Sequence, residues 1–348
     1  MKILVLEGGL SPERDVSKKS SSLIANALLS RGHEVAKVDL YEGIEDDADL
    51  MSLYKSGTDF KFEYSIPETE PDLEKLIAEH GGRRDFIGPR IVEMCRTADS
   101  VFLGLHGAQG ENGQLQAFLD AYDIKYTGSG YVGCCITMDK DISKALAAAA
   151  GIKTAKWIRK PSGKVSSEEV ISEIGLPCVV KPIGCGSSCG VSIVNTEDEL
   201  SAAIAFAEKY KQDILVEQFI KGTEITVGIL NGKALPVIEI VPKQGFYDYK
   251  NKYQADLTDH YCPARLTDAQ TKKAQAVAEE CFKALRMSAY GRIDIIYDTE
   301  KDICWFIEGN NLPGMTNASL LPEAAKVMGI GYEELCERIA MSCGKDSL

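Results

Sequence analysis

The chain of 348 residues is 45% hydrophobic and 26% charged, the composition of a globular protein with enough apolar residues for two or three hydrophobic cores. Its 52 acidic and 39 basic residues give a net charge of -13, which argues against a protein whose main partner is a nucleic acid. Small anions such as nucleotides remain acceptable ligands, because a few lysines and backbone N–H groups can bind them against the overall field.

The cysteines and the N-terminus indicate a cytoplasmic protein. The 11 cysteines are odd in number, scattered and mostly set in apolar runs, and none has the CxxC spacing of a zinc or redox site. No apolar stretch is long enough to cross a membrane, and MKILVLEGG is typical of a core strand entering a glycine turn rather than of a signal peptide. We therefore expect buried, free thiols in a reducing compartment and no membrane partner.

The first third of the chain has the pattern of a parallel sheet. Apolar runs predict three strands, at Lys2–Leu6, Glu34–Leu40 and Ser100–Leu105. A helix is expected over Glu13–Ser30, between the first two strands, which makes a strand–helix–strand unit. Residues 43–97 are acidic and irregular, with a weak helix near 72–80, and no chemistry stands out in them.

From Tyr131 the pattern changes to a mixture of helices and short strands. One long alanine-rich helix is expected over Tyr131–Ala150, and others over 197–210 and 267–286. The expected strands lie near Lys156 and at Cys178–Pro182, 191–194, 213–219, 224–230, 234–242, Arg292–Asp298 and Ile303–Glu308. The polar, tyrosine-rich segment 243–262 is a loop long enough to suggest a function.

The last two expected strands carry the strongest group of functional side chains. By period-two alternation Arg292 and Asp294 share one face of a strand, and Glu308 and Asn310 share a face of the next. If the strands pair, three oxygen ligands suited to Mg²⁺ meet a guanidinium. The alternative is an exposed hairpin with outward charges. The position of Glu308, where the apolar run ending at Ile307 opens into a loop, favours a functional site.

A glycine- and serine-rich loop, residues 184–190, joins two of the expected strands. It offers backbone N–H groups and the hydroxyls of Ser187 and Ser188 to an anion, although it lacks the P-loop pattern. Lys181 precedes it, and Lys140 lies in the motif MDK. Together they indicate a nucleotide-phosphate site; separately, an ordinary hairpin and two surface lysines would explain them.

Two further candidates lie in the parallel-sheet region. Gly8 and Gly9 turn the chain after the first strand towards Glu13, and such a helix start attracts anions. Alternatively, Ser11 is a helix N-cap and Glu13 only complements the helix dipole. His106 ends the third strand, where it is either functional or a structural loop histidine.

These stretches together resemble the D-alanine:D-alanine ligase family, in the family's order and over nearly the whole chain. The segments are GGLSPERDVS (8–17), GLHGAQGENGQLQ (104–116), YTGSG (126–130), MDK (138–140), VVKPIGCGSSCG (179–190), VEQFIKGTEI (216–225), FYDYKNKY (246–253), CPA (262–264), GRID (291–294) and EGNNLPGMTNASLLP (308–322). The resemblance implies an α/β, partly α+β, ATP-grasp fold preceded by a Rossmann-like domain. Its three domains would span 1–130, 131–216 and 217–348, with 243–262 as a lid.

The resemblance also implies roles for individual residues, including contacts to ATP and to two Mg²⁺ ions, which Mn²⁺ could replace. The expected ATP-binding residues are Lys140, Lys181, Ser188, Glu217 (adenine amino group) and Glu224 (ribose). The expected metal ligands are Asp294, Glu308 and Asn310. The first D-alanine would be held by Glu13 with Ser187 and Tyr253, and the second by Ser319 and Lys252, with His106 nearby. Arg292 and the backbone N–H of Gly314 would stabilise the oxyanion.

The implied activity is ATP-dependent ligation of two D-alanines through an acyl phosphate, for peptidoglycan precursors, by a cytoplasmic homodimer. One alternative is ligation of D-alanine to D-lactate or D-serine, but the lid sequence 249–253 and the apolar Leu320 favour D-alanine. Another is an ATP-binding regulatory module without catalysis, which would not need Arg292. The chain departs from the family's usual residues at Asn112, Asn311 and Glu7, and the sequence offers no account of Glu7.

Overall fold

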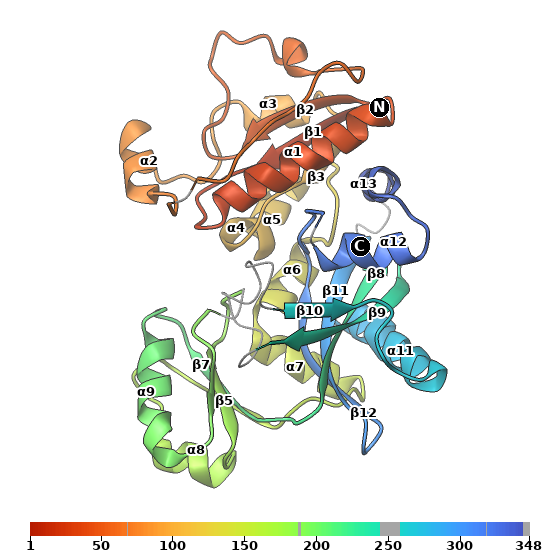
Figure 1. Cartoon of the computed structure of the whole chain (residues 1–348). Coiled ribbons are helices and arrows are strands. Elements are labelled where there is room, and N and C mark those ends of the chain that lie inside the picture. The colour runs from red at the N-terminus through yellow and green to blue at the C-terminus, as the bar shows by residue number, and fades with distance from the viewer. Residues whose placement is uncertain (68, 187–188, 244–257, 318, 344–348) are drawn as a thin grey trace.

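Three sheets organise the chain in the computed structural model, which describes residues 1–67, 69–186, 189–243, 258–317 and 319–343 (Figure 1). A three-stranded parallel sheet has the order β2-β1-β3, a four-stranded antiparallel sheet the order β4-β7-β5-β6, and a five-stranded antiparallel sheet the order β10-β9-β8-β11-β12. The predicted α/β architecture, with its parallel N-terminal sheet, is confirmed.

The parallel sheet forms where the apolar runs predicted it. Its strands are β1 (Lys2–Glu7), β2 (Glu34–Asp39) and β3 (Ser100–Leu103), and α1 (Arg14–Ser30) crosses from β1 to β2. Because β1 lies between the other two and is covered by helices, its apolar side chains from Ile3 to Leu6 are fully buried. The remaining elements of this part are η1 (Leu50–Leu53), α2 (Leu73–Glu79), α3 (Ile91–Cys95), α4 (Ala108–Glu111) and α5 (Gln114–Ala121).

The four-stranded sheet is a small separate layer. It consists of β4 (Trp157–Lys160), β5 (Cys178–Pro182), β6 (Ser192–Val194) and β7 (Ile214–Gln218), with α8 (Ser167–Glu173) and α9 (Glu197–Glu208) packed against it. A capping box of Thr196 and Glu199 starts α9 at Glu197, the residue at which the sequence predicts the helix to begin. β5 and β6 pair antiparallel, so the glycine- and serine-rich loop joins two neighbouring strands.

The five-stranded sheet contains the strands that carry the strongest sequence candidates. Its members are β8 (Thr223–Leu230), β9 (Lys233–Pro242), β10 (Thr258–Tyr261), β11 (Tyr290–Asp298) and β12 (Ile303–Asn310). α11 (Asp268–Ala284) covers it with Ala274, Ala278, Cys281 and Phe282, which recur at helical spacing and are all buried. The end of the expected lid forms a strand, because Thr258–Tyr261 pairs with β9. Residues 244–257 of the expected lid lie outside the described residues.

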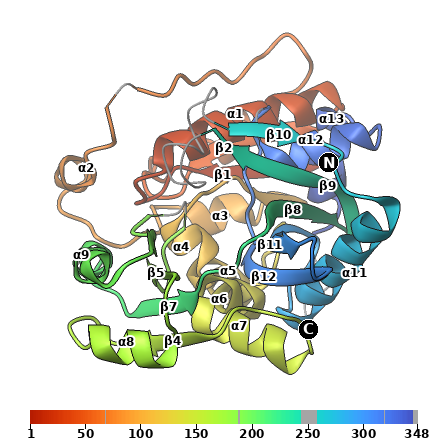
Figure 2. The ribbon, with the colours of Figure 1, turned by 60° about the horizontal axis from the view of Figure 1, so that its bottom comes forward.

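The prediction of one long helix over Tyr131–Ala150 is wrong, because the structure has two helices there. α6 (Tyr131–Met138) and α7 (Lys140–Ala149) meet at Asp139, which has the extended dihedrals φ −94° and ψ 105°. The Asp139 carboxylate accepts the N–H groups of Asp141 and Ile142, each at 3.0 Å, and so caps a new helix. Figure 2 shows α6 and α7 between the two antiparallel sheets.

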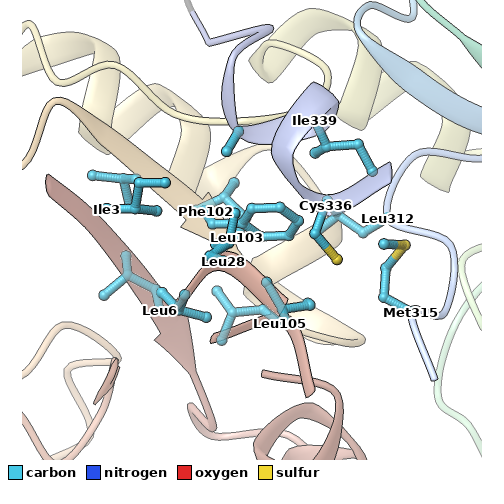
Figure 3. Close-up of a cluster of buried hydrophobic side chains, with 14 of the residues drawn as sticks. Ile3, Leu6, Leu28, Phe102, Leu103, Leu105, Leu312, Met315, Cys336 and Ile339 are labelled. Atoms are coloured by element: carbon cyan, nitrogen blue, oxygen red, sulfur yellow. The ribbon is translucent and has the colours of Figure 1, made fainter. Parts of the chain in front are cut away.

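The end of the chain returns to the parallel sheet. α12 (Leu320–Val327) and α13 (Tyr332–Ala340) follow β12, and their apolar side chains join the core built on β1, α1 and β3. In the close-up of Figure 3, Cys336 and Ile339 lie with Phe102, Leu103 and Leu312. The N-terminal core is thus completed by residues more than 200 positions away in sequence.

The structure supplies an account of Glu7. Both of its carboxylate oxygens accept from Lys37, at 2.7 and 2.8 Å, on the neighbouring strand β2. Burial raises the pKa of Glu7 to about 7, although the charge of Lys37 opposes the shift. Phe62, in the acidic stretch, lies over Lys37 and exchanges backbone hydrogen bonds with the Asn26 side chain of α1. Part of the acidic stretch therefore covers this buried ion pair.

The cysteines are unpaired, as the sequence predicts. The expectation that they are buried is wrong for Cys135, which is exposed, whereas Cys134 beside it is fully buried. Among the described residues, no helix combines the length and the apolar character needed to span a membrane.

Because α13 packs into the N-terminal core, shortening one of its buried side chains should destabilise the protein. Ile339 is fully buried, so Ile339→Ala should lower the free energy of unfolding by about 2–5 kcal/mol. Met341, two residues on, is 54% exposed, and Met341→Ala should change it by less than about 0.5 kcal/mol. Chemical denaturation measures both. Equal effects in the two variants would contradict the packing.

Candidate active site

The pairing of β11 with β12 brings the C-terminal candidates together. Asp294 lies directly opposite Glu308, and Arg292 directly opposite Asn310. Opposite residues of an antiparallel pair project to the same face, so all four side chains lie on one side of the sheet. The exposed-hairpin alternative does not hold, because β8 pairs with the other edge of β11 and Asp294 is 8% exposed.

Asp294 accepts hydrogen bonds from three neighbouring side chains. It accepts from Arg292 Nε at 2.9 Å and Nη2 at 3.1 Å, from Asn310 Nδ2 at 2.9 Å, and from Thr226 Oγ1 of β8 at 2.6 Å. Glu308 Oε2 lies 3.4 Å from Lys140 Nζ at the start of α7. Within the part of the chain that the structure describes, no group of three or more His, Cys, Asp or Glu side chains is arranged to hold a metal ion.

A cavity of about 490 Å³ lies between the two antiparallel sheets, next to this group. Its charged lining comes from both sheets and from α7: Lys140, Lys181, Glu217, Glu224, Glu239, Arg265, Asp294 and Glu308. Its apolar lining includes Val179, Ile193, Val241, Ile296, Trp305 and Ile307. A ligand with an apolar, flat part and an anionic part suits such a space, whose size is that of a small-molecule site.

Three buried charges form a cluster at the cavity, and two of them, Lys181 and Glu217, line it. Lys181 on β5 pairs with Glu217 Oε1 on β7, and Lys144 Nζ lies 2.6 Å from Glu217 Oε2. Burial alone would raise the pKa of Glu217, but the two lysines outweigh it and lower the pKa to about 2. Sequence reasoning missed Lys144. Its spacing of four from Lys140 on a helix was the available signal, since such residues share a face.

The N-terminal candidates meet at the carboxyl ends of the parallel strands. The regular helix α1 begins after Glu13, and the Ser11 hydroxyl accepts the Glu13 N–H at 3.1 Å, which is the hydrogen bond that the N-cap alternative predicts. A Cβ at Gly107 would lie 2.7 Å from Glu13 Oε2, so the chain needs glycine there. His106 contacts Ser20 Oγ at 3.2 Å, and burial lowers the pKa of its imidazole.

Glu111, at the end of α4, is a second residue that sequence reasoning missed. Its Oε1 accepts the Gly107 N–H at 2.8 Å. Burial, and then the charge of Glu13, raise the pKa of Glu111 to about 7, while Arg292 opposes the shift. Because both Glu13 and Arg292 act on it, Glu111 lies between the N-terminal and C-terminal halves of the site. Its place in GENG gave no signal beyond a polar loop.

Asp39, at the end of β2, shapes the turn that leads to Glu13. Its Oδ1 accepts from the backbone of Gly9 at 3.2 Å, and its Oδ2 from Arg14 at 2.9 Å. A Cβ at Gly8 would lie 2.0 Å from Asp39 Oδ2, which requires glycine at that position as well. The sequence indicated the glycine turn but not the carboxylate that holds it.

The remaining candidates lie on three segments. Ser319 is the N-cap of α12, its Oγ accepts the Thr316 N–H at 2.9 Å, and a Cβ at Gly314 would lie 2.8 Å from that oxygen. Ser319 and Gly314 are therefore neighbours in the loop after β12. The other four candidates, Ser187, Ser188, Lys252 and Tyr253, lie outside the described residues.

Family models account for almost the whole chain. A model described as D-ala D-ala ligase N-terminus matches residues 2–129, and one described as D-ala D-ala ligase C-terminus matches residues 118–341. This chain belongs to the D-alanine–D-alanine ligase family. The resemblance read from the sequence motifs is confirmed.

Individual relatives of the ligase family agree with this. A D-alanine–D-alanine ligase of Pediococcus pentosaceus is 41% identical over an alignment of 354 positions, which covers 100% of this chain and 98% of the relative. The crystal structure of the Bacillus anthracis ligase complexed with ATP is 30% identical, with a TM-score of 0.74, over 98% of this chain and 96% of that one. The VanG D-Ala:D-Ser ligase of Enterococcus faecalis is 26% identical, with a TM-score of 0.74, over 97% and 98%.

The Glu217 cluster predicts a pH-dependent stability difference. Glu217→Gln leaves Lys144 and Lys181 buried without their counter-charge, which should lower the free energy of unfolding by about 3–5 kcal/mol at neutral pH. A carboxyl group whose pKa is lower in the folded than in the unfolded protein stabilises the fold at pH values above its unfolded pKa. This stabilisation is lost as the pH falls to the folded pKa. The gap between wild type and variant should therefore shrink from pH 4.5 to about 2. Urea titrations across this range would contradict the pairing if the gap stayed constant.

Proposed function

We propose that this chain is an ADP-forming ligase that joins two D-alanine molecules into D-alanyl-D-alanine, the dipeptide of peptidoglycan precursors. Family membership supports the reaction. The observation that assigns this reaction to particular residues is that Asp294 lies opposite Glu308, beside a cavity that Lys140 and Lys181 also line. Carboxylates for metal ions and ammonium groups for phosphates, converging on one space, are what phosphoryl transfer from ATP requires.

The side chains of Asp294, Glu308 and Asn310 on β11 and β12 suit Mg²⁺. Asp294 and Glu308 offer hard carboxylate oxygens, and one or two carboxylates completed by phosphates and water is the arrangement that Mg²⁺ prefers. Asn310 turns its amide nitrogen to Asp294, and rotation of the amide would present its oxygen instead. Bound Mg²⁺ neutralises phosphate charge during transfer. The family resemblance supports two ions, with Mn²⁺ as a substitute.

In the first half of the reaction, ATP converts the carboxylate of one D-alanine into an acyl phosphate. Lys140 and Lys181 contact the phosphates, Glu217 accepts from the adenine amino group, and Glu224 binds the ribose. The side chains of these four residues line the cavity, which supports the assignment. Ser188 is assigned to the phosphates by its motif alone. A carboxylate is a poor electrophile, so this activation step is what makes amide formation possible.

In the second half, the amine of the other D-alanine attacks the acyl carbon and phosphate leaves. Arg292, with the backbone N–H of Gly314, stabilises the oxyanion of the tetrahedral intermediate. Glu13 holds the ammonium of the first D-alanine, and His106 lies near the second. Motif positions add Ser187 and Tyr253 beside Glu13, and Ser319 and Lys252 at the second carboxylate.

Three domains, 1–130, 131–216 and 217–348, divide these tasks, and residues 243–262 act as a lid that excludes water from the acyl phosphate. Residues of α12 and α13 belong to the third domain by sequence but pack with the first, so the two move together in this scheme. We further propose a cytoplasmic homodimer, as the resemblance implies. The net charge of -13 supports the absence of a nucleic-acid partner.

The choice of the second substrate can be tested directly. The alternative partners D-serine and D-lactate are disfavoured by Leu320, a buried apolar residue beside Ser319. We expect phosphate release with Mg²⁺-ATP and D-alanine alone, none with L-alanine, and a product with the mass of the dipeptide even when D-serine or D-lactate is in excess. Turnover only with a mixed pair would assign the other ligation, and ATP binding without any turnover would indicate a regulatory module.

A second test addresses Glu308. Glu308→Gln removes a carboxylate charge from the metal and phosphate region and should lower kcat by about 100-fold or more, since a metal-held charge contributes several kcal/mol to the transition state. Glu300→Gln, the same change at an exposed position after β11, should leave kcat unaltered. Coupled detection of ADP measures both. Comparable activity in the two variants would remove Glu308 from the mechanism.

A further inference from the structure

Lys144 is a buried charge that the reaction as described does not use. Its side chain is 0% exposed. The ammonium group lies 2.6 Å from Glu217 Oε2 and 2.6 Å from Thr154 Oγ1, and 5.1 Å from the centre of the Trp157 ring. A fully buried ammonium is costly unless it is paired, and here a carboxylate, a hydroxyl and an aromatic face surround it.

Glu217 is held from two sides by these contacts. Lys181 binds Oε1 and Lys144 binds Oε2, so neither oxygen is free to turn away. Each oxygen of a carboxylate can accept a further hydrogen bond, which leaves Glu217 able to accept from a ligand in the cavity that it lines. Two ammonium groups against one carboxylate also leave the cluster with one net positive charge beneath a site for an anionic ligand.

Lys144 also connects the two antiparallel sheets. Glu217 belongs to β7 of the four-stranded sheet. On the other side, Thr154 Oγ1 donates to the carbonyl of Phe306 on β12 at 3.0 Å, and the Phe306 N–H donates to the Lys153 carbonyl at 2.8 Å. Glu308 is two residues further along β12. One ammonium group on α7 thus joins the proposed adenine contact to the strand that carries the proposed metal ligand.

We propose that Lys144 is a positioning residue for the nucleotide: it fixes the Glu217 carboxylate for the 6-amino group of the base and holds β7 in place relative to β12. The base contact rests on the proposed function. A purely structural lysine would affect stability alone, whereas this role requires an effect on nucleotide affinity and on the choice of base.

The test is binding of Mg²⁺-ATP and Mg²⁺-ITP to Lys144→Met, measured by calorimetry without D-alanine. Methionine keeps the length of the side chain, and Glu217 with Lys181 remains a neutral pair, so no unpaired buried charge is created. Loss of a charge-assisted contact should weaken ATP binding by about tenfold or more. ITP carries a carbonyl where ATP has its amino group, so its affinity should fall less and the ATP-to-ITP preference should shrink.

Two variants serve as controls. Lys156→Met makes the same change at a lysine whose side chain is 61% exposed, and should alter neither affinity. Thr154→Val keeps the Lys144–Glu217 pair but removes the link to Phe306, and should weaken both nucleotides equally. For Lys144→Met, unchanged ATP affinity, or equal losses for ATP and ITP, would overturn the inference. Because binding is measured without turnover, failure of the wild type to release phosphate with D-alanine would refute the ligase proposal separately.

Discussion

The antiparallel register of β11 and β12 is the constraint on which the candidate site depends. It sets Asp294 against Glu308 and Arg292 against Asn310, and a shift of β12 by one residue would turn Glu308 and Asn310 to the opposite face. β8 holds β11 from its other edge, by backbone pairing and by the bond from Thr226 to Asp294. The carboxylates of the candidate site are therefore held by a sheet whose backbone pairing leaves them little freedom.

Local charge explains how an acidic protein can bind an anionic nucleotide. The net charge of -13 is spread over the whole chain, whereas Lys140, Lys144 and Lys181 gather around one cavity. Burial strengthens their effect, because water screens them less than it screens the surface acids. Their carboxylate partners, Glu217 and Glu308, offset part of the cost of burying them and fix where they point.

The C-terminal helices pack against the N-terminal core, and this packing connects the proposed substrate side of the site to the proposed nucleotide side. α12 and α13 complete the core of the parallel sheet, and Asn311, directly after the proposed metal ligand Asn310, donates to the Glu111 carbonyl at 2.9 Å and to Thr137 Oγ1 at 2.6 Å. These bonds connect the end of β12 to α4 and α6. Glu111, whose pKa responds to Glu13 and Arg292, lies at this junction.

The sequence by itself determined most of the strands and helices, the face shared by Arg292 and Asp294, and the family, because periodicity and motifs are written within a few neighbouring residues. Only the tertiary structure decided which charges pair. Lys144 and Glu217 are 73 positions apart, and Lys37 gives Glu7 its partner from another strand. The break at Asp139 and the packing of α13 also needed it. At Asp139 a local cap competes with helix propensity, and the sequence does not say which prevails. The buried face of α13 could pack on more than one core, so long-range contacts decided its place.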